Sequence, residues 1–130
     1  MYLTLGFWVA LTTTVVLMVV SLVSGFGRKR RLHLVTGPLT MVSLTVAVIL
    51  TEQLVRKFEF PAEELAFHKI CAKTAGLSAL PVVVTGLMLV RWQSMRPWHR
   101  LAVVLFVLAS LVATGTGIWV WSLATLRPGN

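Results

Sequence analysis

The sequence has few charged residues and a single cysteine. Of its 130 residues, 12% are charged and four are acidic, whereas 57% are hydrophobic. Soluble domains contain about 25% charged and about 45–50% apolar residues. This composition therefore excludes a soluble globular enzyme and a disordered tail. Because Cys71 has no second cysteine to pair with, the sequence also excludes a secreted scaffold held by internal disulfides.

Several catalytic and binding signatures are missing. No acidic residue lies deep in an apolar run, which argues against a small proton-coupled exporter. No Cys/His cluster has zinc spacing, and no glycine pattern of a P-loop or dinucleotide site follows a strand. The net charge is +8, but the basic residues lie between apolar runs and form no soluble basic body, so nucleic acid is not an expected partner. An electron-transfer or accessory subunit is favoured over a stand-alone enzyme.

Four long apolar runs fill nearly the whole chain. A helix needs about 20 apolar residues to cross the hydrocarbon core of a bilayer. The sequence predicts an all-α integral membrane protein in which residues 1–130 form a single membrane domain, a bundle of four transmembrane helices. The predicted helices span residues 2–26, 33–56, 64–91 and 98–125.

The distribution of charge predicts the orientation. Arg28–Arg31 follow the first run, and three more arginines follow the third, with no acid on that side: Arg91, Arg96 and Arg100. All four glutamates lie on the other side. The positive-inside rule then places both termini outside and both basic loops in the cytoplasm, and we expect a bacterial inner membrane. The basic block is expected to contact anionic lipid headgroups, the alternative being a cytoplasmic partner.

Three histidines lie at or near the starts of predicted helices. Each is followed 18 residues later by a small or hydroxyl residue, so that His33, His68 and His99 are followed by Thr51, Gly86 and Gly117. Eighteen residues make five helical turns, which places each pair on one line along its helix. The two glycines are both preceded by threonine. This spacing indicates an internal repeat over the last three helices.

The depth of the histidines suggests which of them act together. The second and fourth helices run in the same direction, so His33 and His99 lie at the same cytoplasmic level. Both share helix faces with small residues, Gly37 among them beside His33, and a low-spin haem needs two strong axial ligands. Nearby arginines would neutralise haem propionates, namely Arg30, Arg31 and Arg100.

His68 stands apart from this pair. It lies near the outer level, where no second histidine is expected. As a ligand it would need methionine, water or a neighbouring subunit on the other side of an iron, or a chlorophyll-type pigment that takes one ligand. The competing interpretation is that the small residues are helix-packing seams and that the histidines are interface residues.

The segments Arg31-Leu32-His33-Leu34-Val35-Thr36-Gly37, Phe67-His68-Lys69 and Trp98-His99-Arg100, with late Thr-Gly pairs, form a loose pattern. Over residues 30–120 the chain resembles small four-helix membrane b-type cytochromes. The resemblance implies one haem b with His33 and His99 as the axial metal ligands. The first helix departs from the pattern because it carries no histidine.

These observations predict a membrane b-type cytochrome or a haem-bearing anchor subunit. It would pass electrons to or from quinone or a partner subunit, and would contact membrane lipids and other membrane subunits. The alternative is a non-catalytic structural subunit of a larger respiratory or photosynthetic complex, holding pigment or lipid.

Overall fold

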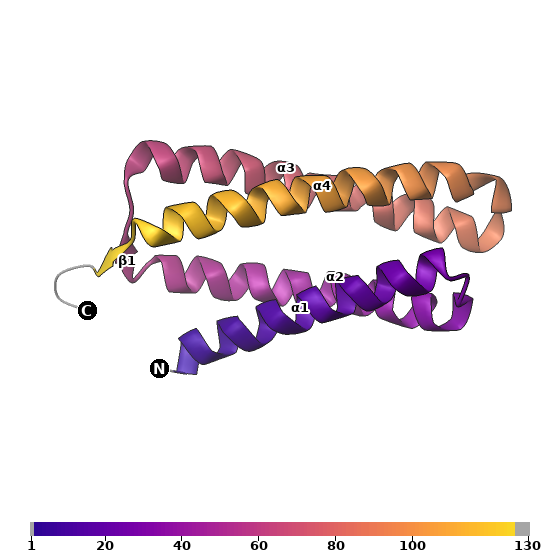
Figure 1. Ribbon diagram of the computed structural model, residues 1–130, viewed down its shortest axis with the longest axis horizontal. Coiled ribbons are helices and arrows are strands. Elements are labelled where there is room, and N and C mark those ends of the chain that lie inside the picture. The colour runs from indigo at the N-terminus through magenta and orange to yellow at the C-terminus, as the bar shows by residue number, and fades with distance from the viewer. Residues whose placement is uncertain (1, 127–130) are drawn as a thin grey trace. The chain divides into compact units, whose positions relative to one another are not determined.

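The computed structural model describes residues 2–126, and of Leu126 only the backbone. The chain forms four long helices with short connections (Figure 1). They are α1 (Tyr2–Phe26), α2 (Arg30–Val55), α3 (Ala62–Arg91) and α4 (Arg96–Ser122). A 3₁₀ turn, η1 (Gln93–Met95), precedes α4, and two short strands, β1 (Phe58–Glu59) and β2 (Thr125–Leu126), pair into a two-stranded sheet.

The predicted all-α fold with four membrane-length helices is confirmed. The helices contain 25, 26, 30 and 27 residues. At a rise of 1.5 Å per residue each is longer than the roughly 30 Å hydrocarbon core of a bilayer. All four are long and apolar enough to cross a membrane.

Five of the eight helix ends differ from the prediction by one to three residues, whereas both ends of α1 and the end of α3 agree with it. α2 begins at Arg30 rather than at residue 33, and α4 begins at Arg96 rather than at residue 98. α3 begins two residues early, and α2 ends one residue early. At the other end, α4 stops at Ser122 because Thr125 already belongs to β2. The early starts have a simple cause: the first turn of a membrane helix lies at the headgroup level, where charged residues are tolerated.

The chain divides into two compact units, each built on one antiparallel helix hairpin. Among the described residues, the first comprises residues 2–59 and Leu126, and in it α1 packs along α2. The second comprises residues 60–125, and in it α3 packs along α4 (Figure 1). In the first hairpin the turn passes through Arg28, whose φ of 57° is left-handed. In the second, η1 makes the turn.

Small and polar side chains fill the seam between α1 and α2. The buried residues there include Thr14, Ser21, Ser24, Thr36 and Thr40. The hydroxyl groups of Thr14 and Ser43 lie 2.8 Å apart across the seam. Threonines also donate back to their own helix, as Thr40 does to the carbonyl of Thr36 at 2.7 Å. Among the described residues, no buried side-chain polar atom lacks a hydrogen-bond partner.

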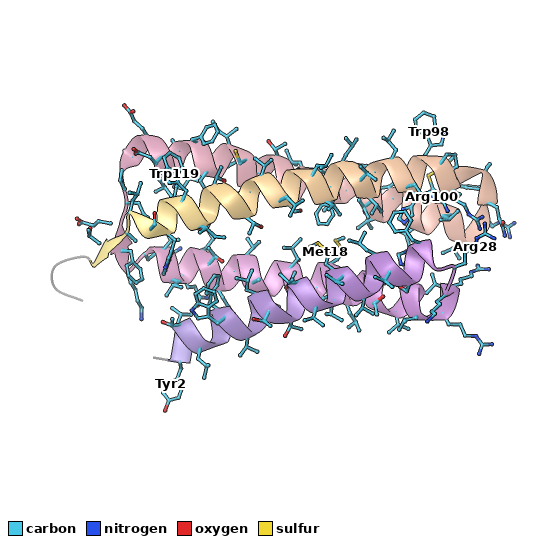
Figure 2. All side chains as sticks on the ribbon, viewed as in Figure 1. Tyr2, Met18, Arg28, Trp98, Arg100 and Trp119 are labelled. Atoms are coloured by element: carbon cyan, nitrogen blue, oxygen red, sulfur yellow. The ribbon has the colours of Figure 1, made fainter. Side chains whose placement is uncertain are left out.

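Most large apolar side chains are exposed, although Leu54, Phe106 and Val120 are buried. Leu87 is 70% exposed, Ile118 68% and Leu77 66%. A soluble protein would bury such residues, whereas lipid tails are as apolar as they are, so helices in a membrane associate through small and polar residues instead. The outward apolar surface is the surface that lipid would contact. Figure 2 shows Trp98 near one end of α4 and Trp119 near the other, as expected for aromatic residues at two membrane interfaces.

Candidate functional site: three anchored histidines

His33, in the first turn of α2, is anchored on α1. Its Nδ1 lies 2.9 Å from the backbone carbonyl oxygen of Ser21 and 3.3 Å from the hydroxyl of the same residue. A carbonyl oxygen only accepts hydrogen bonds, so Nδ1 carries the proton and donates it. In the neutral imidazole the nitrogen without a proton is then Nε2.

His99, in the first turn of α4, is anchored on α3. Its Nδ1 lies 3.0 Å from the hydroxyl of Thr85. That hydroxyl lies 2.5 Å from the carbonyl oxygen of Pro81 and has a single hydrogen, which goes to the carbonyl. The imidazole must therefore donate from Nδ1, and His99 has the same tautomer as His33.

His68, near the start of α3, is anchored on α4 in the same way. Its Nδ1 lies 3.0 Å from the hydroxyl of Thr116. The Thr116 hydroxyl lies 3.0 Å from the carbonyl oxygen of Val112 and 3.1 Å from that of Ala113. The same donor count again places the proton of the imidazole on Nδ1.

A glycine on the neighbouring helix makes room for each imidazole. A Cβ atom added to Gly25 would lie 3.1 Å from Nδ1 of His33. One added to Gly86 would lie 3.2 Å from Cε1 of His99, and one added to Gly117 would lie 3.0 Å from Cε1 of His68. Each ring therefore rests directly on the backbone of the opposite helix, where any side chain would push it away.

The contacts extend the predicted internal repeat. His68 and Gly86 do lie on one helix, but the Thr-Gly pairs that His68 and His99 touch belong in each case to the helix beside the histidine. The hydroxyl of Thr51, the third predicted partner, donates to the carbonyl of Ala47 in its own helix. Sequence reasoning missed Ser21 and Gly25 of α1 altogether. The Thr-Gly pairs were visible, but the helix that each would face was not.

The other predicted site residues lie close to these anchors. Gly37 faces α1, where an added Cβ would meet the hydroxyl of Ser21 at 3.7 Å, so it belongs to the His33 cluster. Arg30 and Arg31 are exposed in the first turn of α2, and Arg100 is exposed next to His99 (Figure 2). His33 lies in the first unit and His99 in the second, and their pairing stays a prediction.

The described residues contain no group of three or more histidine, cysteine or acidic side chains that could hold a metal ion. Cys71 is half-buried and has a free thiol. The three imidazoles have in common an Nδ1 that is bonded to the neighbouring helix of the same hairpin.

The fold and these anchors define a class: an all-α protein of four membrane-length helices with a histidine fixed at three of the helix starts. Comparison of the chain with protein-family models, with curated proteins and with solved structures found no match. The resemblance to b-type cytochromes accordingly stays a prediction, based on the residues quoted for it.

Proposed function

We propose that this protein is a membrane b-type cytochrome or haem-bearing anchor subunit, with His33 and His99 as the axial ligands of one haem b. The observation that carries the proposal is the anchoring of both imidazoles through Nδ1. The bond from His33 to the Ser21 carbonyl is 2.9 Å long, and that from His99 to the Thr85 hydroxyl is 3.0 Å. A histidine held in this way presents the Nε2 lone pair in a fixed direction.

Chain topology supports the choice of these two histidines. Consecutive helices that cross a membrane run in alternating directions, so α2 and α4 begin at the same surface. His33 and His99 lie in the first turns of these helices. Arg30 and Arg31 extend from the start of α2, and Arg100 from the start of α4, where they would bind the propionates of a haem.

When bound, a haem would supply one-electron transfer, with quinone or a partner subunit as the donor or acceptor. The chain's own residues have narrower tasks. The Ser21 carbonyl and the Thr85 hydroxyl orient the imidazoles and raise the basicity of Nε2 by accepting a hydrogen bond from Nδ1–H. The arginines supply positive charge, and the apolar helices exclude water.

The same proposal includes an orientation, with both termini outside a bacterial inner membrane. Four consecutive exposed basic residues, Arg28–Arg31, run from the turn between α1 and α2 into the first turn of α2. Exposed arginines also stand at the last residue of α3 and the first of α4, Arg91 and Arg96, whereas the glutamates lie at or near the opposite ends of the helices, as Glu52 and Glu63 do. An excess of arginine and lysine favours the cytoplasmic side.

The test is a reduced-minus-oxidised absorption spectrum of protein purified from haem-replete cells. We expect a sharp b-type α-band that is lost in both His33→Ala and His99→Ala. Cys71→Ala is the matched control, because Cys71 is half-buried in α3 and its thiol is free. A flat spectrum from the haem-replete protein would overturn the proposal.

A second candidate function is a structural subunit of a larger membrane complex, holding pigment or lipid. It is favoured by the close fit of the imidazoles on Gly25, Gly86 and Gly117, which by itself is a device for bringing two helices together. If this is the function, the protein will purify without haem, and His33→Ala and His99→Ala will lower the unfolding temperature without removing any absorption band.

A further inference from the structure

Two exposed lysines of α3 lie on the face of the helix that points away from α4. Lys69 and Lys73 are four residues apart, which places them one above the other on the same face. Ala75, the buried residue of α3, lies about 160° around the helix from Lys73. The only long helix that α3 packs along is α4. The two ammonium groups are therefore turned toward whatever surrounds the hairpin.

The depth of these lysines is unusual for charged residues. α3 begins at Ala62 and has 30 residues. It is therefore about 45 Å long, the thickness of a bilayer with its headgroups. Lys69 lies about 10 Å and Lys73 about 16 Å from the start of α3, at 1.5 Å per residue. If α3 is centred on a hydrocarbon core of about 30 Å, both Cα atoms lie inside that core. A charge at such a depth indicates a binding site.

The acidic residues of the hairpin are not spaced to neutralise this charge. Residues 60–125 contain two of them, Glu63 and Glu64, and both lie in the first turn of α3. Side chains of one helix pair at spacings of three or four residues, whereas Lys69 follows Glu64 by five and Lys73 follows it by nine. Two like charges one turn apart repel each other, most strongly where the dielectric constant is low. An anion bound between them would remove this repulsion.

The same face of α3 has room for an acyl chain on the membrane side of the lysines. Gly76 follows Lys73 by three residues, and a Cβ atom added to it would meet nothing within 4 Å. Leu80, one turn further toward the middle of the helix, is 61% exposed. From the start of the helix inward, the face thus presents two positive charges, an open glycine and an exposed leucine. A phospholipid in a bilayer has its charged and apolar parts in the same order.

We propose that Lys69 and Lys73 bind the phosphate of an anionic phospholipid in the leaflet at which α3 begins, and that an acyl chain of this lipid lies over Gly76 against Leu80. Lysine stems extend along apolar surface toward the headgroups, so both ammonium groups can turn toward one phosphate. Two positive charges select a lipid of net negative charge, because they repel the cationic headgroup of phosphatidylcholine. The site lies within the second hairpin and does not depend on the proposed haem.

The position of the two lysines distinguishes them from basic residues that set the orientation of a membrane protein. Such residues are concentrated in loops on the cytoplasmic side. Lys69 and Lys73 lie inside α3, toward the end opposite the exposed Arg91. Consecutive helices alternate in direction, so in a membrane this is the surface opposite the basic block Arg28–Arg31. A role in orientation therefore does not account for the two lysines, whereas a bound anion does.

The experiment titrates the whole protein in mild detergent with phosphatidylglycerol and counts the retained lipid molecules by native mass spectrometry. We expect a tightly retained phosphatidylglycerol, and no retention of phosphatidylcholine with the same acyl chains. Lys69→Gln combined with Lys73→Gln should raise the lipid concentration at half-occupancy about 25-fold, about fivefold for each lysine. Lys69→Arg combined with Lys73→Arg should keep the lipid. The matched control is Lys29→Gln with Lys57→Gln, which removes the same charge from exposed positions before and after α2 and should leave the tight site unchanged.

A second pair of variants keeps both charges and fills the space beside them. Gly76→Leu places a side chain where the acyl chain would lie and should weaken the retention of phosphatidylglycerol severalfold. Gly115→Leu is the control, because an added Cβ there also meets nothing within 4 Å, but on α4. Neither substitution meets another side chain in the hairpin, so a difference between them reports on the lipid and not on the fold.

Three results would overturn the inference. The first is equal retention of phosphatidylglycerol by the unaltered protein and by the double glutamine variant. The second is a rise in unfolding temperature with inorganic phosphate that equals the rise with phosphatidylglycerol and needs the same lysines, which would make the ligand a free phosphate. The third is a double glutamine variant that keeps the lipid and loses a co-purifying subunit, which would assign Lys69 and Lys73 to an acidic protein partner.

Discussion

The Nδ1 of His68 in α3 and the hydroxyl of Thr116 in α4 lie 3.0 Å apart, and Cε1 of the same imidazole would lie 3.0 Å from a Cβ at Gly117. One histidine thus makes both a hydrogen bond and a backbone contact across a pair of apolar helices. Within lipid, interhelical hydrogen bonds and close packing on small residues are the two main sources of helix association. At the other end of the hairpin, His99 of α4 makes the same two contacts with Thr85 and Gly86 of α3.

The glycine contact predicts a strong difference between two neighbouring substitutions in α4. Gly117→Ala would place a methyl group 3.0 Å from the His68 ring and should destabilise the protein by about 1–3 kcal/mol, since overpacking forces the neighbour to move. Gly115→Ala meets nothing within 4 Å and should be neutral, or stabilising by up to about 1 kcal/mol, because alanine is the better helix former. Thermal unfolding in detergent measures both. If the two substitutions changed the unfolding temperature equally, the close contact between Gly117 and the His68 ring would be contradicted.

The threonine anchors predict a smaller but specific loss. Thr85→Val keeps the shape of the side chain and removes the acceptor for His99. It should lower the free energy of unfolding by about 0.6 kcal/mol, the average for interhelical hydrogen bonds in a membrane. Thr85→Ser should retain the bond. Thr45→Val is the control, because Thr45 is exposed and its hydroxyl bonds only to the carbonyl of Met41 in its own helix. A loss of stability of the same size in Thr45→Val would mean that the hydrogen bond between Thr85 and His99 contributes nothing to stability.

The His33 anchor should respond differently, because its acceptor is a backbone atom. The imidazole lies 2.9 Å from the Ser21 carbonyl and 3.3 Å from the Ser21 hydroxyl, so the shorter bond survives when the side chain is removed. Ser21→Ala should therefore change the unfolding temperature less than Thr85→Ala does. The two variants, unfolded in the same detergent, give the comparison. A larger effect for Ser21→Ala would assign the anchor to the hydroxyl instead.

The helices themselves could be predicted from the sequence because uninterrupted apolar runs of membrane length have few other structural solutions. Their ends could be predicted less well. The sequence predicts that the second helix begins at residue 33, yet Arg30 and Arg31 already form the first turn of α2, where lipid headgroups and water accept charge. Composition alone does not separate a basic loop from a basic first turn.

The partners of the histidines show a second limit. The spacing from His68 to Gly86 predicts that both lie on one line of α3, but the identity of the helix opposite that line depends on tertiary packing. The partner of His33 is harder still to predict, because its acceptor is the backbone carbonyl oxygen of Ser21, and every residue carries such a group. The proposed pairing of His33 with His99 rests on their expected position at the same membrane surface, and the reduced-minus-oxidised absorption spectrum tests it.

The charge distribution leads to a last prediction, on the sidedness of the chain. In a Cys71→Ala background, a cysteine placed at Lys29 lies in the exposed turn between α1 and α2, and one placed at Glu63 lies in the exposed first turn of α3. If the basic turns are cytoplasmic, an impermeant thiol reagent will label Glu63→Cys in spheroplasts and Lys29→Cys only in inverted vesicles. The Cys71→Ala protein without a new cysteine measures background labelling. The reverse pattern would place both termini in the cytoplasm and would move the pair His33 and His99 to the outer surface.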